Sequence, residues 1–160
     1  MKKGLLFLST HIINKGIVSE YFKLSKAQEY DCILAIDNSS LRLPFESRIC
    51  TKTFYDKEVK CFIFDENLHK ELNLPNITFN KLNEKFSEIM WYNADYRFYY
   101  VKNFFPNYQY YWQFDYDVFC NGNSYSAFLE KYANSKKDLL ITHFRPEIKN
   151  GKWVWTNNID

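Results

Sequence analysis

The pattern of apolar positions along the chain predicts strands that alternate with helices. Short continuous apolar runs, which suit strands buried on both faces of a parallel sheet, occupy residues 5–9, 31–36 and 60–65. Apolar residues recur at helical spacing between the first two runs, across residues 15–28. The order strand, helix, strand is the signature of a βαβ unit, and it indicates a parallel sheet.

The remaining chain predicts more elements of the same kinds. Residues 41–58 show no clear period and are expected to be irregular. Further helices are expected at 66–72, 94–105 and 124–132, and further strands at 77–79, 108–119 and 138–142. The sequence therefore predicts an α/β fold with a mostly parallel central sheet and helices on both faces. The 160 residues are in the usual range for a single domain.

Composition and charge exclude several classes of function. The four glycines are too few for a dinucleotide-binding loop, and the chain contains no phosphate-binding GxxxxGK[ST] motif. No strand-to-helix elbow of the kind that carries a nucleophilic serine is recognisable. A net charge of +2 does not require a nucleic-acid partner, and none is expected.

The N-terminus and the cysteines predict a cytoplasmic protein. The apolar run that ends before Ser9 is shorter than the roughly 7–15 residues of a secretory signal, and no run approaches a membrane span of about 20. Cys32 and Cys61 sit inside apolar runs, where a free thiol packs as a small hydrophobic group. Reduced thiols are typical of a reducing compartment.

Acidic residues fall at or near the ends of several predicted strands. They are Asp37, Asp65 and the pair Asp115 and Asp117. Ligands of open parallel sheets bind beyond the carboxyl ends of the strands, so these acids indicate a site. Each has a simpler alternative, because Asp37 can begin a turn and Asp65 can cap the helix that follows it.

Asp115 and Asp117 follow a very aromatic strand that we expect to be buried. Residues two apart on a strand share a face, so both carboxylates can converge on one cation. Mg²⁺ and Mn²⁺ use one or two carboxylates together with phosphate oxygens. The alternative is a pair of surface acids at a strand end, with the neighbouring aromatic residues directed inward.

This segment resembles GT-A glycosyltransferases, which carry a DxD motif at the end of a central strand. The resemblance rests on Trp91-Tyr92-Asn93-Ala94-Asp95-Tyr96-Arg97, then on Pro106-Asn107-Tyr108-Gln109-Tyr110-Tyr111-Trp112-Gln113-Phe114-Asp115-Tyr116-Asp117, and on Gly122. The chain is also similar to poorly characterised glycosyltransferase-like proteins of bacteria and fungi with a YYW-x₂-(E/D)-x-D signature. The likeness covers residues 86–130 and is only architectural over residues 1–80.

The resemblance implies a metal-dependent donor site. Asp117 would be the main ligand of Mn²⁺ or Mg²⁺, and Asp115 would reach a metal-bound water or the ribose. The metal would bridge the diphosphate of a nucleotide sugar. Asp37 would hold the base or the ribose, and Thr10 and His11 would lie beside the nucleotide.

The helix before the motif would add a basic residue, Arg97, that reaches the donor. Residues 1–145 would form the nucleotide-sugar-binding core, and the polar tail 146–160 would begin an acceptor region. His143 and Arg145, after the last predicted strand, could add a metal ligand or a phosphate contact. The resemblance identifies no catalytic base.

Three functions follow as alternatives. The first is a glycosyltransferase that moves a sugar to a glycan or lipid-linked acceptor in cell-surface glycan biosynthesis, a role compatible with peripheral membrane association. The second is a truncated or non-catalytic binding module of the same fold, since complete GT-A enzymes are usually longer. The third is another phosphate-handling α/β enzyme of the haloacid dehalogenase type. That class needs a DxD motif directly after the first strand, where this chain reads Ser9-Thr10-His11.

Overall fold

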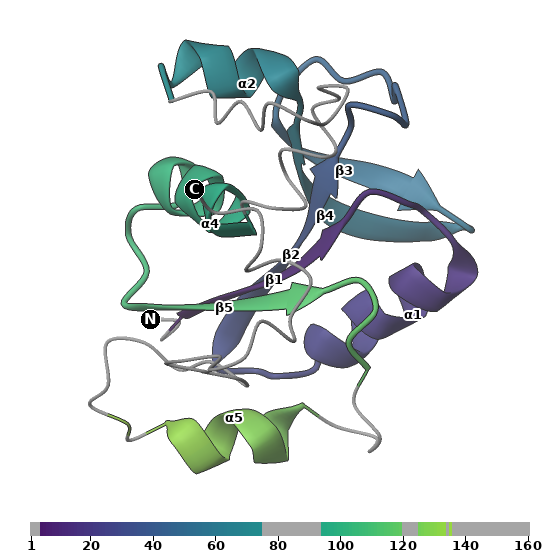
Figure 1. Cartoon of the computed structure of the whole chain (residues 1–160). Helices are drawn as coiled ribbons and strands as arrows, with labels where there is room; N and C mark the ends of the chain where they lie inside the picture. Colours follow the sequence, from purple (N-terminus) through teal and green to yellow (C-terminus); the bar gives the residue numbers. More distant parts are fainter. Residues whose placement is uncertain (1–3, 75–93, 120–124, 134, 136–160) are drawn as a thin grey trace, which may run out of the picture.

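The computed structural model describes residues 4–74, 94–119, 125–133 and 135 (Figure 1). Its elements, in chain order, are β1 Gly4–Thr10, α1 Lys15–Leu24, β2 Tyr30–Asp37, β3 Ile49–Phe54, β4 Lys57–Phe64, α2 Glu66–Glu71, α4 Ala94–Phe104, β5 Tyr110–Asp115 and α5 Ser126–Tyr132. The strands expected at 77–79 and 138–142, the residues His143 and Arg145, and the tail 146–160 lie outside the described residues.

The described strands form one five-stranded sheet in the order β3-β4-β2-β1-β5. β4, β2, β1 and β5 are mutually parallel, and only β3 runs antiparallel, beside β4. The chain leaves β1 towards β2 on one side and later adds β5 on the other side of β1. Such a reversal of strand order is a topological switch point, and ligands of open α/β sheets bind at its carboxyl edge.

Helices cover both faces of the sheet, as the sequence predicts. In Figure 1, α1 and α5 lie on one side of the strands, and α2 and α4 lie on the other. A hydrophobic core lies on each face of the sheet, and alternate residues of β1 pack in the two cores. Leu6 and Leu8 pack in the core on the α1 side, and Leu5 and Phe7 pack in the core on the α4 side. All of β1 is buried because it is paired on both edges and covered on both faces.

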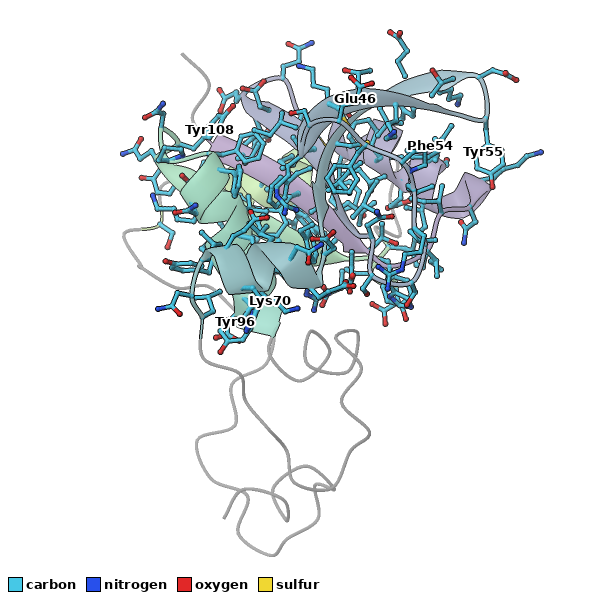
Figure 2. The ribbon with its side chains drawn as sticks, turned by 90° about the horizontal axis from the view of Figure 1, so that it is seen from above. Glu46, Phe54, Tyr55, Lys70, Tyr96 and Tyr108 are labelled. Carbon is cyan, nitrogen blue, oxygen red and sulfur yellow. The ribbon has the colours of Figure 1, made fainter. Side chains whose placement is uncertain are left out.

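A β-hairpin corrects the expectation that residues 41–58 are irregular. β3 and β4 pair from Ile49–Phe62 to Phe54–Lys57, joined by Tyr55 and Asp56. Both joining residues have positive φ, 51° and 60°, which matches the twist of a two-residue hairpin turn. Asn-Gly is the usual sequence of such a turn, and the Tyr-Asp pair at this position does not indicate a hairpin. Phe54 and Tyr55 lie at the projecting end of the hairpin (Figure 2).

β5 is shorter and more exposed than the expected strand at 108–119. It ends at Asp115, where the amide of Val118 donates to the Asp115 carbonyl at 2.9 Å and closes a turn. Among its six residues only Phe114 is buried, since β5 is the outermost strand of the described sheet on this side. The prediction of a buried aromatic strand is therefore wrong for most of β5.

None of the described helices is long and apolar enough to cross a membrane. Cys32, Cys50 and Cys61 are free thiols, and the first and last of these are buried as expected. Cys120 lies outside the described residues.

Candidate functional site

Three neighbouring strand ends direct polar side chains to the same face of the sheet. Ser9 of β1 pairs in register with Asp115 of β5, and Asp37 ends β2 on the other side of β1. All three continue the alternation that places Phe7 and Ala35 in the core on the α4 side. The switch point therefore carries a hydroxyl and two carboxylates on the face that α4 covers.

Arg97 of α4 connects two of these groups. Its Nη1 lies 3.2 Å from Ser9 Oγ, to which it donates, and 3.2 Å from Asp115 Oδ1, with which it forms an ion pair. The Arg97 side chain is only 14% exposed, whereas that of Asp115 is 41% exposed. Arg97 Nε is buried and has no hydrogen-bond partner among the described residues. The guanidinium is thus held at the switch point with donor capacity to spare.

Asp37 is a buried acid beside this arginine. The residue is 5% exposed, and its Oδ1 accepts a hydrogen bond from the Ser39 amide at 3.0 Å. Burial raises the pKa of Asp37, and the hydrogen bonds of Ser39 and the charges of His11 and Arg97 oppose that rise. Asp37 begins a turn through this hydrogen bond, as the simpler interpretation of its sequence position predicted. The turn leaves the carboxylate electrostatically coupled to Arg97 and His11.

Thr10 and His11 take different positions after β1. The Thr10 hydroxyl donates to the Ile12 carbonyl at 2.6 Å and accepts from the Ile12 amide at 3.1 Å, so it holds the loop that leads to α1. The His11 ring packs edge-on against Tyr116, with ring centroids 4.6 Å apart. His11 therefore lies beside the turn of the DxD motif, whereas the Thr10 hydroxyl is occupied by its own loop.

The two acids of the DxD motif differ in environment. Asp115 Oδ1 accepts from Gln113 Nε2 at 3.3 Å besides pairing with Arg97, while Asp117 is exposed in the turn that follows. The described residues contain no group of three or more His, Cys, Asp or Glu side chains placed to hold a metal. Two carboxylates on one turn do suit the mode in which Mg²⁺ or Mn²⁺ binds one or two protein acids together with a diphosphate. Asp115 and Asp117 offer oxygen donors of the chemical type that such a cation uses.

Asp65 has a structural role. It is the N-cap of α2 and accepts from the amides of Asn67 and Leu68 at 3.2 and 3.3 Å. Arg48 Nη1 lies 3.3 Å from its Oδ1. The capping alternative for this acid is confirmed.

The role of Ser9 and the hydrogen bond that supports α4 from α2 were not predicted from the sequence. Ser9 could have been found from the alternation of β1, because it shares the parity of Leu5 and Phe7. The support is a hydrogen bond of 2.7 Å between His69 Nδ1 and the Tyr100 hydroxyl, which joins α2 to α4. No local motif predicts that contact between residues 31 positions apart.

Comparison of the chain with protein-family models, with curated proteins and with solved structures gave no match in any of the three. The likeness to GT-A glycosyltransferases therefore rests on the motif residues, and the site must be interpreted from its own geometry.

Proposed function

We propose that this protein binds a nucleoside-diphosphate sugar at the switch point between β1 and β5 and acts as a metal-dependent glycosyltransferase. One observation carries the proposal: Ser9, Asp37 and Asp115 converge from three adjacent parallel strands on the face where α4 presents Arg97. This edge is where open α/β sheets bind nucleotides.

Arg97 is suited to the diphosphate. A guanidinium stays charged at all relevant pH values and offers donors in a planar fork that matches phosphate oxygens. Arg97 has a buried Nε without a partner among the described residues, next to an Nη1 that already faces the strand ends. Asp37, at the end of the strand next to Ser9, would accept hydrogen bonds from the hydroxyls of a ribose.

Asp117 and Asp115 are the residues that would hold Mn²⁺ or Mg²⁺. Such a cation, when bound, supplies Lewis-acid stabilisation of the leaving diphosphate. The exposed Asp117 carboxylate can approach a cation without rearrangement of the strand, whereas Asp115 has first to separate from Arg97. We propose a glycan or a lipid-linked saccharide as the acceptor. The motif residues themselves concern only the donor site.

The Arg97–Asp115 ion pair favours a second candidate, a donor-binding module without catalysis. An acid whose partner is already a cation does not need a metal, so the site could hold a nucleotide through Arg97 alone. The two candidates differ in whether ligand binding depends on a divalent cation.

Thermal unfolding with a panel of nucleoside diphosphates and their sugars, with and without Mn²⁺, tests the proposal. A ligand at about 100 times its Kd adds about 2.7 kcal/mol, which corresponds to a melting shift of about 5–10 °C for a domain of this size. We expect a shift that needs both Mn²⁺ and one particular nucleotide, and release of free sugar or transfer to an acceptor with the same donor. A shift independent of Mn²⁺ and without turnover would favour the binding module.

Arg97→Gln and Arg48→Gln form a matched pair for this test. Both arginines are mostly buried, with side chains 14% and 16% exposed, and both pair with carboxylates. Arg48 pairs with Asp65, which follows β4, and with Glu71 of α2, whereas Arg97 contacts Ser9 of β1 and Asp115 of β5. We expect Arg97→Gln to abolish the nucleotide-induced shift and Arg48→Gln to retain it in the variant's own melting curve.

A further inference from the structure

We propose that the Arg97–Asp115 ion pair makes the site selective for a metal–diphosphate chelate over either the bare cation or the metal-free anion. This inference rests on the proposed function for the identity of its physiological ligand. The pair joins the residue that would hold the phosphates to a residue that would hold the metal, with 3.2 Å between Nη1 and Oδ1. Arg97 is therefore a specificity-determining residue.

The pair opposes a cation that arrives alone. Asp115 Oδ1 already faces Arg97 Nη1 and Gln113 Nε2, so an incoming cation has to displace a positive charge from the same oxygen. Displacement takes Asp115 from a guanidinium that is only 14% exposed and leaves Asp37 as the acid coupled to it. Removing the partner of a poorly solvated charge has a cost, because the arginine that remains stays desolvated.

The same pair opposes an anion that arrives alone. Arg97 Nη1 is shared between Ser9 Oγ and Asp115 Oδ1, each at 3.2 Å. A diphosphate that approaches the guanidinium meets the negative charge of Asp115 beside it. Binding of the anion to Arg97 would leave Asp115 unpaired.

A chelate avoids both costs because it brings a partner for each member of the pair. Its cation can take Asp115 while its phosphate oxygens take the Arg97 guanidinium. The two binding events are then coupled, and coupling of this kind is reciprocal: the cation must raise anion affinity by the factor by which the anion raises cation affinity. The ion pair therefore disfavours binding of a bare cation or of a metal-free diphosphate at this site.

The variants Asp115→Asn and Asp117→Asn separate this effect from general electrostatics. Each variant removes one negative charge, and the two positions are only two residues apart. Of these two acids, Asp115 is the one that pairs with Arg97. With inorganic pyrophosphate as the probe and the metal removed by a chelator, isothermal titration calorimetry should show binding at least about fivefold tighter for Asp115→Asn than for Asp117→Asn, the lower end of typical site coupling. Equal affinities of the two variants, or weaker binding by Asp115→Asn, would overturn the proposal.

A second arm uses the metal alone. Electron paramagnetic resonance of free Mn²⁺ should show binding at least about fivefold tighter for Arg97→Gln than for Arg48→Gln, since each variant loses one positive charge but only the first frees Asp115. Equal Mn²⁺ affinities of these two variants would also overturn the proposal. Both arms are independent of the nucleotide panel, so their success with no nucleotide-dependent shift would reject the proposed function and keep the paired-ion selectivity.

Discussion

His69 and Tyr100 join the two helices that cover the face of the candidate site. Nδ1 of His69 lies 2.7 Å from the Tyr100 hydroxyl, and the two residues are 2% and 0% exposed. The ring of Tyr96 packs against His69 with centroids 5.0 Å apart, and Figure 2 shows Tyr96 and Lys70 where α4 meets α2. Arg97 is carried on this same helix, so the contact fixes the element that positions it.

Tyr100→Phe should lower the free energy of unfolding by about 1–3 kcal/mol, because it removes a buried hydrogen bond of His69. Urea unfolding followed by circular dichroism gives the change. Tyr99→Phe is the control, since Tyr99 is the next residue on α4 and is 47% exposed. If the two variants unfolded at the same urea concentration, the His69–Tyr100 contact would have no stabilising role.

Tyr125→Phe should destabilise the protein by about 1.5–3 kcal/mol, the range for a hydrogen bond to a charged group. The Tyr125 hydroxyl donates to the buried carboxylate of Glu20, which also pairs with Lys23 at 2.8 Å. The contact ties α5 to α1 across the sheet face opposite to α4. Tyr132→Phe, at the end of the helix that Tyr125 precedes, is the control. A smaller loss of stability for Tyr125→Phe than for Tyr132→Phe would contradict the prediction.

The stability of the protein should respond to Asp37 with a definite sign. Burial raises the pKa of Asp37 above its ordinary value of 3.8, so between that value and the raised pKa the folded state binds more protons than the unfolded state. The free energy of unfolding must then fall as the pH rises through this window. Asp37→Asn removes this loss and keeps an oxygen for the Ser39 amide.

Melting temperatures of Asp37→Asn and of the unchanged protein from pH 3.5 to 7 test the sign. We expect the difference between the variant and the unchanged protein to grow in favour of the variant towards neutral pH. A difference that moved in the opposite direction would show that the Asp37 carboxylate is stabilised when ionised. A buried acid that costs stability is characteristic of a functional site.

Cys32 and Cys61 should resist alkylation in the folded protein. Burial raises the pKa of each thiol to about 12 from 9.0, which lowers the thiolate fraction at pH 8 about a thousandfold. Cys50 is partly exposed, whereas Cys32 and Cys61 are buried. We therefore expect iodoacetamide to modify Cys50 before the other two. Peptide mapping of a Cys120→Ser variant measures the order, with the urea-unfolded protein as the control. Modification of Cys32 as fast as Cys50 would contradict the burial of β2.

The fold was predictable from the sequence where a local pattern determines the structure. β1 and β2 are continuous apolar runs because both of their faces are covered, and α1 shows its apolar stripe clearly. The α1 prediction ran past its end at Leu24 into residues 25–28, where backbone bonds such as Ala27 N–H to Leu24 O form a turn. Helix ends are set by capping as much as by periodicity.

The hairpin and the site were less predictable for different reasons. The Tyr55-Asp56 turn adopts positive φ without glycine, because pairing of β3 with β4 imposes a conformation that local preference does not favour. The acids of the site follow from strand ends, which the sequence shows. The contact of Arg97 with Ser9 spans 88 positions, and only the packing of α4 on the sheet brings them together.

We propose that the switch point between β1 and β5 binds a nucleoside diphosphate together with a divalent cation. Backbone amide NMR spectra recorded during a titration with Mg²⁺ and nucleoside diphosphates test it most directly. We predict that shift changes concentrate at Ser9, Asp37 and Asp115, at the carboxyl edge of the parallel strands, and at Arg97 of α4. The claim would be contradicted if every nucleotide left these amides unchanged. It would be contradicted equally by changes confined to the cavity of about 370 Å³ that Ala27, Leu129 and their neighbours line at the start of β2.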